Sequence, residues 1–278
     1  MRMMLGLHCI ITLSIVIISF VLMGISGLQE FWQRLGGILS TFVISALIGM
    51  AILLVGRRQK GDDLARISLA ALIFINAMAL TYLPLLIERA PQIGGFNWLG
   101  KSVSLVYLLL AVVILPSDWR RSLRLWAWPD RSKYRSTLIG LFLFAILGTG
   151  LAFTGIGDAD PIETAIFQLT LPSLTEEILF RSLLLVLWGG VGLASAVRFP
   201  TSFGRSAVAS SVLFGLVHGF LFSPSSGFIF DPVALIATGI FGAGFAWLAI
   251  QSRSLLPAVI AHSFVNGIGP VMHLLGLF

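Results

Sequence analysis

The sequence predicts an all-α, polytopic transmembrane helix bundle with about nine spans, in a range of about eight to ten. Of its 278 residues, 57% are hydrophobic and only 11% are charged, whereas an ordinary soluble domain has about 25% charged residues. Long apolar runs alternate with short polar breaks, and the single cysteine allows no disulfide within the chain. These observations exclude a soluble enzyme, a disordered chain and a disulfide scaffold.

The apolar runs define the spans in chain order. Each is near the roughly 20 residues that a helix needs to cross a bilayer. The predicted spans are residues 5–27, 36–56, 67–87, 100–116, 137–156, 173–191, 206–222, 232–250 and 255–276. The first run is longer than a signal-peptide core and has no Ala-x-Ala site after it, so we expect an uncleaved anchor. The apolar segment 161–171 is either a re-entrant piece or an extension of the sixth helix kinked at Pro172.

The distribution of basic residues predicts the orientation. With the N-terminus in the cytoplasm, most of the 18 Lys and Arg residues fall in cytoplasmic loops, whereas Arg34, Arg89 and Lys101 fall on the other side. This bias follows the positive-inside rule and gives an N-in, C-out topology. It also explains the net charge of +6 without a nucleic-acid partner. The expected partners are the lipid bilayer and a membrane-associated protein or peptide substrate.

The longest polar break, residues 117–136, divides the chain. Trp119, Leu123 and Trp126 recur at helical spacing beside several arginines, which predicts a short interfacial helix on the cytoplasmic leaflet. We therefore expect an accessory region at 1–136, with about four spans and this segment, and a second transmembrane domain at 137–278.

Two acidic residues stand out because of where they lie. Glu176 and Glu177 are embedded in an apolar span, while the other acidic residues of the 12 fall in loops or at span ends. An ionisable side chain at membrane depth is costly and is a functional-site hypothesis by default. Glu177 and Arg181 are four residues apart and can form an ion pair on one helix face. Glu176 points about 100° away and has no matching cation, which leaves its carboxylate for general-base chemistry.

Polar residues also lie inside two later spans. His218 is in the seventh predicted span, and His262 and Asn266 are four residues apart in the ninth. At about 1.5 Å per residue, His218, Asn266 and Glu176 lie about 18, 16 and 22 Å from the cytoplasmic ends of their helices. We therefore expect the three helices to bring these side chains to one buried polar site.

Two kinds of chemistry suit such a site. A carboxylate and an imidazole can activate a water, and a second imidazole and an amide can stabilise the oxyanion that forms when this water attacks a peptide carbonyl. Alternatively, Glu176, His218 and His262 can bind a zinc-like divalent metal that activates the water. Both routes hydrolyse a peptide bond. A transporter with a proton relay and a non-proteolytic scaffold are the other classes that remain open.

Three short motifs support the hydrolase. Glu176-Glu177 with Arg181 resembles the EExxxR motif of the CPBP family, the CAAX proteases and bacteriocin-processing (ABI) enzymes, which are related to the type II CAAX prenyl proteases. Phe214 and His218 resemble its FxxxH motif, and the HxxxN motif follows in order, each in its own predicted span.

The resemblance covers about residues 137–278 and implies an intramembrane endopeptidase, either glutamate-dependent or metal-dependent, in a bacterial plasma membrane. It implies that Glu176 is the general base and that His218 orients the water. It implies that His262 and Asn266 form the oxyanion hole, with Glu177 and Arg181 as supporting residues. Some members of the family have no known prenylated substrate, so a bacteriocin-immunity protein or scaffold with the same fold is the alternative.

Overall fold

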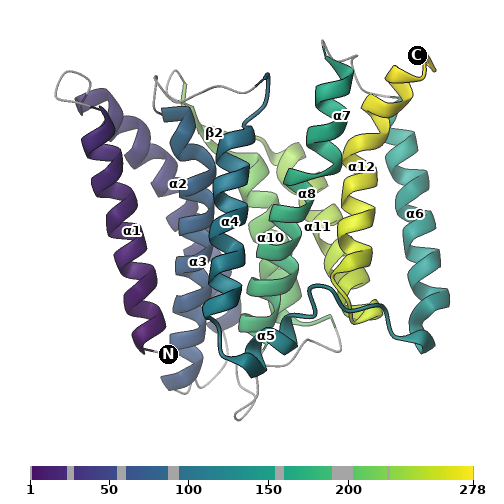
Figure 1. The fold of residues 1–278 in the computed structure, drawn as a ribbon, viewed down its shortest axis with the longest axis horizontal. Coiled ribbons are helices and arrows are strands. Elements are labelled where there is room, and N and C mark those ends of the chain that lie inside the picture. Colours follow the sequence, from purple (N-terminus) through teal and green to yellow (C-terminus); the bar gives the residue numbers. More distant parts are fainter. Residues whose placement is uncertain are drawn as a thin grey trace.

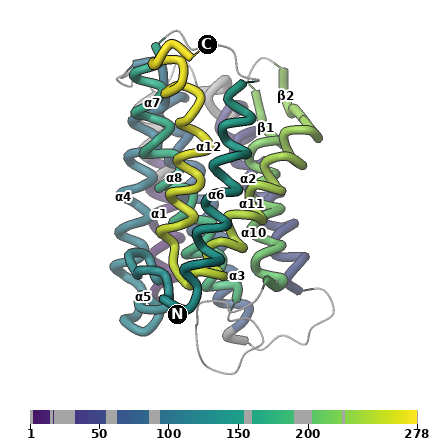
Figure 2. Tube along the Cα trace, turned by 90° about the vertical axis from the view of Figure 1, so that its right-hand side faces the viewer, coloured from purple at the N-terminus to yellow at the C-terminus, as the bar shows by residue number. Residues whose placement is uncertain are grey.

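The chain folds into a bundle of long helices that run side by side (Figures 1 and 2). The computed structural model describes residues 2–23, 28–54, 61–86, 94–153, 160–189, 203–223 and 226–277. Apart from one short hairpin, the regular structure in these ranges is helical, which confirms the predicted all-α bundle.

The accessory region supplies the helices on the left of Figure 1. They are α1 (Arg2–Met23), α2 (Leu28–Leu54), α3 (Gly61–Leu86) and α4 (Trp98–Ile114). A buried polar network joins three of them: His8 Nδ1 lies 2.8 Å from Tyr107 Oη, and Asn76 Nδ2 donates to Tyr107 Oη at 3.2 Å. Hydrogen bonds of this kind between helices compensate for the weak hydrophobic drive in lipid.

The polar break is less helical than predicted. Helix α5 (Ser117–Leu123) ends where Arg124 adopts a left-handed conformation with φ of 50°. Leu123 is buried, but Trp126 lies beyond the helix and is 66% exposed. The prediction of one helical stripe that includes Trp126 is therefore wrong, because the left-handed residue turns the chain out of the helix. The segment instead docks on the connection between α11 (Pro232–Ser252) and α12 (Leu256–Leu274), where Leu255 N donates to Arg124 O at 3.4 Å.

The second half continues with α6 (Tyr134–Ala152), α7 (Pro161–Leu169) and α8 (Leu171–Glu177). A π-helical segment (Ile178–Leu184) and α9 (Leu185–Gly189) complete that helix. The break between α7 and α8 lies at Thr170, with φ of −119° and ψ of −86°. Of the two readings of segment 161–171, this geometry favours an extension of the sixth helix, broken two residues before Pro172.

The last elements are α10 (Arg205–Gly219), β1 (Phe220–Ser223), β2 (Gly227–Phe230), α11 (Pro232–Ser252) and α12 (Leu256–Leu274). β1 and β2 form an antiparallel hairpin in which Phe220 pairs with Phe230. The hairpin shortens the seventh predicted span, because residues 220–222 are strand. Gly215 lets α10 lie against α11, since a Cβ there would sit 2.5 Å from Leu235 O.

Each predicted span overlaps a helix. Four described stretches are long and apolar enough to cross a membrane by length and composition: Gln33–Leu54, Asp63–Leu85, Arg131–Ala152 and Pro232–Ser252. The number of about nine spans and the N-in, C-out orientation stay predictions. Arg89, used for the orientation, lies outside the described residues, as do Arg57, Arg58, Lys60 and Arg198.

The two halves share one apolar core. Phe74 of α3 meets Phe180 of the π-helical segment with ring centroids 6.0 Å apart, and Phe180 in turn meets Phe214 of α10 at 5.2 Å. The boundary predicted at residue 136 stays a prediction, but across it the helices pack together around the site described next.

Candidate active site

Glu176 lies at the centre of the polar site, in the last turn of α8. Its side chain is 14% exposed. Lys101 Nζ donates to one carboxylate oxygen, Oε1, at 2.7 Å. The other oxygen, Oε2, faces His218 Nε2 at 3.9 Å and His262 Nε2 at 3.8 Å. These last two distances are longer than a hydrogen bond, so the two rings face the carboxylate across a small gap.

His218 is oriented by its own helix. Its Nδ1 lies 2.7 Å from the carbonyl oxygen of Phe214, one turn earlier in α10. A carbonyl only accepts hydrogen bonds, so Nδ1 is the donor and carries hydrogen. In the neutral ring Nε2 is then an acceptor, and it is this nitrogen that faces Glu176. The spacing of the FxxxH motif thus has a local reason, since residues four apart share a helix face.

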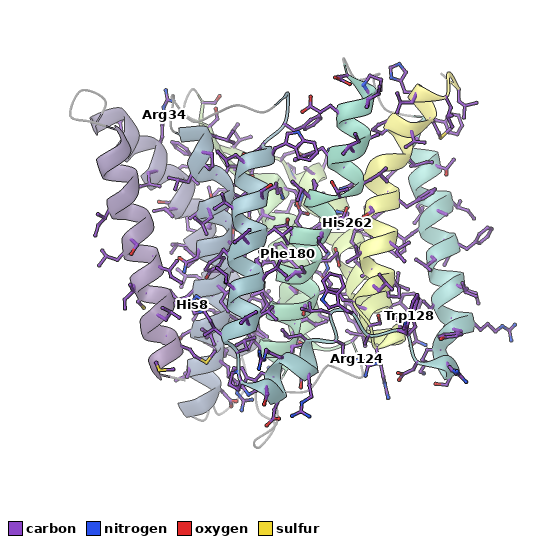
Figure 3. The ribbon with its side chains drawn as sticks, in the orientation of Figure 1. His8, Arg34, Arg124, Trp128, Phe180 and His262 are labelled. Atoms are coloured by element: carbon purple, nitrogen blue, oxygen red, sulfur yellow. The ribbon has the colours of Figure 1, made fainter. Side chains whose placement is uncertain are left out.

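His262 is oriented by the second carboxylate. Its Nδ1 donates to Glu177 Oε1 at 2.8 Å, and its ring stacks on Phe245 with centroids 4.7 Å apart. Figure 3 shows His262 between α8 and α12, near the middle of the bundle. With the ring fixed on both sides, Nε2 is directed at Glu176. The HxxxN spacing places Asn266 on the same side of α12, where it lines the same cavity.

Glu177 and Arg181 form the predicted ion pair. Their side chains are fully buried, and Arg181 Nη1 lies 3.3 Å from Glu177 Oε1. Arg181 also donates from Nη2 to Gly242 O at 3.3 Å, and its guanidinium lies over the Phe214 ring at 4.1 Å. The pair therefore holds α8, α10 and α11 around the site. Because Glu177 Oε1 contacts both Arg181 and His262, the supporting pair is connected directly to the predicted oxyanion hole.

A cavity of about 590 Å³ opens beside these side chains. Such a volume is typical of a small-molecule or peptide-side-chain site. Its apolar walls are Leu151, Phe167, Pro172, Phe214, Ala237, Phe241, Phe245 and Val265. Its polar lining is Lys101, Gln168, Glu176, His218, Thr238, His262 and Asn266. Four of these, Glu176, His218, His262 and Asn266, are the predicted catalytic residues, so α8, α10 and α12 meet at one cavity as expected.

Lys101 is the residue of this site that the sequence analysis missed. The expectation that Glu176 has no matching cation is wrong, because the cation comes from another helix and not from its own. Lys101 was placed on the outer side as an end residue of the fourth span, but it lies one turn inside α4. A lone lysine at the start of an apolar run was the signal that could have found it, since such a residue needs a partner.

A second contact fastens the start of α4 to α7, the helix that precedes the one that carries Glu176. Glu163, in the first turn of α7 and outside the predicted spans, accepts hydrogen bonds from Gly95 N at 2.9 Å and Trp98 Nε1 at 2.8 Å. The Gly95 hydrogen bond lowers the pKa of Glu163, with Trp98 adding to the effect. Gly94 has a φ of 66°, and a Cβ there would meet the Glu163 carboxylate at 1.9 Å. Only glycine permits this contact.

The predicted metal set was Glu176, His218 and His262. Within the described part of the chain, no three or more His, Cys, Asp or Glu side chains are grouped closely enough to hold a metal ion. A zinc ion binds its nitrogen and oxygen ligands at about 2.0–2.2 Å. Lys101 occupies Oε1 of Glu176, whereas Oε2 faces His218 Nε2 at 3.9 Å and His262 Nε2 at 3.8 Å. A divalent metal held by Glu176, His218 and His262 stays a prediction.

Comparison with known proteins finds a family similarity in the second half of the chain. Residues 158–268 match the family model for type II CAAX prenyl endopeptidase Rce1-like proteins. This segment is therefore similar to an Rce1-like domain. The match spans α7 to most of α12 and includes the three motifs and all six predicted site residues. No curated protein and no solved structure matches the chain.

The Rce1-like match confirms the resemblance to the CPBP and CAAX protease family. The Rce1-like family is one of membrane-embedded proteases, so the match supports the predicted hydrolase class and a peptide substrate. The accessory helices α1 to α4 lie outside the matched residues, and with them Lys101.

Proposed function

We propose that the protein is an intramembrane endopeptidase that hydrolyses a peptide bond of a membrane-associated protein or peptide. The observation that carries the proposal is the geometry around Glu176. One carboxylate oxygen and two imidazole nitrogens face one another at 3.8 and 3.9 Å, beside a cavity lined mainly by apolar side chains. A water in that gap would be within reach of a carboxylate that can take its proton.

In the proposed reaction, Glu176 Oε2 takes a proton from the water as its oxygen attacks the carbonyl carbon of the substrate. His218 Nε2 accepts a hydrogen bond from the other O–H of that water, and this hydrogen bond fixes the direction of attack. The peptide carbonyl oxygen becomes an oxyanion as the C–O bond forms. When the tetrahedral intermediate collapses, the C–N bond breaks and Glu176 returns the proton to the leaving amine. The products are a new carboxylic acid, which releases its proton to water and becomes a carboxylate, and a new amino terminus.

The oxyanion would be stabilised by His262 and Asn266. The Asn266 carboxamide donates through its NH₂ group, and it lines the cavity on the same face as the ring. His262 already donates from Nδ1 to Glu177, so it can donate from Nε2 only when both ring nitrogens carry hydrogen. The proposed role of Glu177 is to fix the orientation of the His262 ring through this hydrogen bond, with Nε2 directed toward the substrate side.

The proposal is tested with Glu176→Gln, which keeps the shape of the side chain and removes the base. Membranes of cells that express the wild type, Glu176→Gln or the control Asp118→Asn are compared by quantitative proteomics for new protein termini. Asp118 is a suitable control because its side chain is 86% exposed and distant in the fold, in α5. We expect termini that depend on the wild type to persist in Asp118→Asn and to disappear in Glu176→Gln. Equal cleavage by Glu176→Gln would refute the role of Glu176 as the base. The absence of any termini that depend on the wild type would favour the alternative, a non-proteolytic scaffold or immunity protein.

A purified assay complements the proteomics. A library of quenched-fluorescent peptides of random sequence, presented in detergent, provides a substrate without knowledge of the cellular one. General acid–base catalysis contributes about 10²–10⁴-fold to a rate, so Glu176→Gln should lower kcat by at least about 100-fold. Because the substitution is isosteric, the yield of folded protein should stay at the wild-type level.

A further inference from the structure

Lys101 connects the accessory region to the proposed catalytic base. Lys101, in the first turns of α4, donates to Glu176 Oε1 at 2.7 Å. Its side chain is only 16% exposed, and that of Glu176 is 14% exposed. A contact this short between two oppositely charged and largely buried side chains is a charge-assisted hydrogen bond. Such a bond is stronger than a hydrogen bond between neutral groups. Among the described residues that line the cavity, Lys101 is the only lysine or arginine.

The charges of the site are divided into two pairs. Glu177 has Arg181 as its partner at 3.3 Å, and Glu176 has Lys101. A carboxylate that lacks a partner at membrane depth is expensive to ionise, and a base must be ionised before it can accept a proton. Lys101 supplies that partner while it occupies only Oε1. Oε2 therefore stays available, and the lysine fixes the orientation in which the carboxylate faces His218 and His262.

The first turn of α4 is held in place from two sides. Asn97 caps the helix by accepting from Gly100 N at 3.0 Å, and it donates from Nδ2 to Thr81 O of α3 at 2.6 Å. Trp98 donates to Glu163 of α7. A Cβ at Gly100 would lie 2.0 Å from Thr81 O, so the α3–α4 contact requires glycine there. These contacts fix the backbone from which Lys101 extends, one turn after the cap.

We propose that Lys101 is a positioning residue of the active site, and that the accessory region completes this site by holding Glu176 in its reactive orientation. The inference rests on the proposed role of Glu176 as general base. It assigns a function to α4, which lies outside the Rce1-like domain at residues 158–268. The Rce1-like segment accordingly contains the proposed base but not the residue that orients it.

The test uses the full chain and three variants. Lys101→Met removes the charge and keeps much of the length of the side chain, Lys101→Arg keeps the charge, and Lys133→Met removes a lysine from the 3₁₀ turn before α6. The probe is the quenched-fluorescent peptide that the wild type cleaves best in the random library. Displacing a catalytic group by about 1 Å can lower a rate by about 100-fold. We expect Lys101→Met to lower kcat by about 10–100-fold with KM within about threefold, Lys101→Arg to recover most of that loss, and Lys133→Met to match the wild type.

A second measurement separates positioning from general loss of structure. Thermal unfolding in detergent is compared for Lys101→Met in the wild-type background and in the Glu176→Gln background. If the lysine acts through the carboxylate, the substitution lowers the melting temperature much less when Glu176 is already neutral. Equal shifts in the two backgrounds would contradict the proposed coupling.

The outcomes also distinguish this inference from the proposed function. If Glu176→Gln is inactive and Lys101→Met keeps the wild-type kcat, the positioning role is refuted while the proposed base stands. If KM rises and kcat does not change, Lys101 binds substrate and the positioning role is again refuted. If Glu176→Gln itself cleaves at the wild-type rate, it is the proposed function that fails.

Discussion

The buried pair of Glu177 and Arg181 offers a quantitative test of how the site is held. The perturbation is Arg181→Met, which replaces a guanidinium that has no exposed surface and lies 3.3 Å from Glu177 Oε1. The substitution leaves the Glu177 carboxylate buried with His262 as its remaining partner. It also removes the hydrogen bond to Gly242 O and the stacking on Phe214. The loss in the free energy of unfolding is therefore larger than the loss caused by breaking one ion pair at the surface.

Breaking a buried ion pair by removal of one partner costs about 3–5 kcal/mol. For a protein of this size, about 1 kcal/mol shifts the melting temperature by roughly 2–4 °C, so we expect Arg181→Met to lower it by roughly 6–20 °C. The assay is thermal unfolding in detergent, followed by tryptophan fluorescence, because Trp188 is buried next to this region. The double variant Glu177→Gln with Arg181→Met should recover part of the loss, since no unpaired charge remains.

The control is Arg121→Met. Its ion pair with Asp118 also joins neighbours on one helix face, but the two side chains are 80% and 86% exposed. Exposed pairs contribute about 0–1 kcal/mol, so this variant should unfold within a few degrees of the wild type. The expectation is refuted if Arg181→Met unfolds at the same temperature as Arg121→Met, or if the double variant unfolds at no higher temperature than Arg181→Met.

Three further predictions concern the contacts around the cavity. Because the hydrogen bond from Gly95 lowers the pKa of Glu163 from 4.5, this contact contributes full stability above that value and loses it as the pH falls through the lowered pKa. The fluorescence of Trp98 should therefore change on acidification below about pH 4.5 in the wild type and not in Glu163→Gln. Gly215→Leu places side-chain atoms where a Cβ alone would lie 2.5 Å from the Leu235 carbonyl, so the yield of folded protein in detergent should drop sharply, with Val208→Leu, at an exposed position of the same helix, as the control. Asn266→Ala should lower kcat about 10²–10³-fold with little change in KM; an unchanged kcat would remove the residue from the oxyanion hole.

Much of the fold was predictable because the bilayer imposes simple rules on the sequence. Apolar runs of helical length predicted the helices, and each predicted span overlaps one. Local periodicity also predicted contacts within one helix, such as Glu177 with Arg181, because residues four apart share a face. In the same way, the position of His262 relative to Asn266 followed from spacing alone. These contacts depend only on the geometry of a single helix.

The features that sequence reasoning missed depend on how separate elements meet. Lys101 contacts Glu176 across 75 positions in the chain, and no periodicity connects them. Trp126 was expected on a helix face, but Arg124 adopts a left-handed conformation that its residue type does not signal. The hairpin after His218 was hidden because strands of four aromatic-rich residues resemble the end of an apolar helix. Tertiary contacts determine these features.

The central claim is that Glu176 activates a water for peptide hydrolysis, and isotope labelling tests it most directly. Purified wild-type protein and Glu176→Gln are given the best-cleaved fluorogenic peptide in water enriched in ¹⁸O, and the products are analysed by mass spectrometry after a single turnover. The account predicts one ¹⁸O atom in the new carboxylate of the wild-type product and no product above background from Glu176→Gln. Labelled product from Glu176→Gln at the wild-type rate would contradict it.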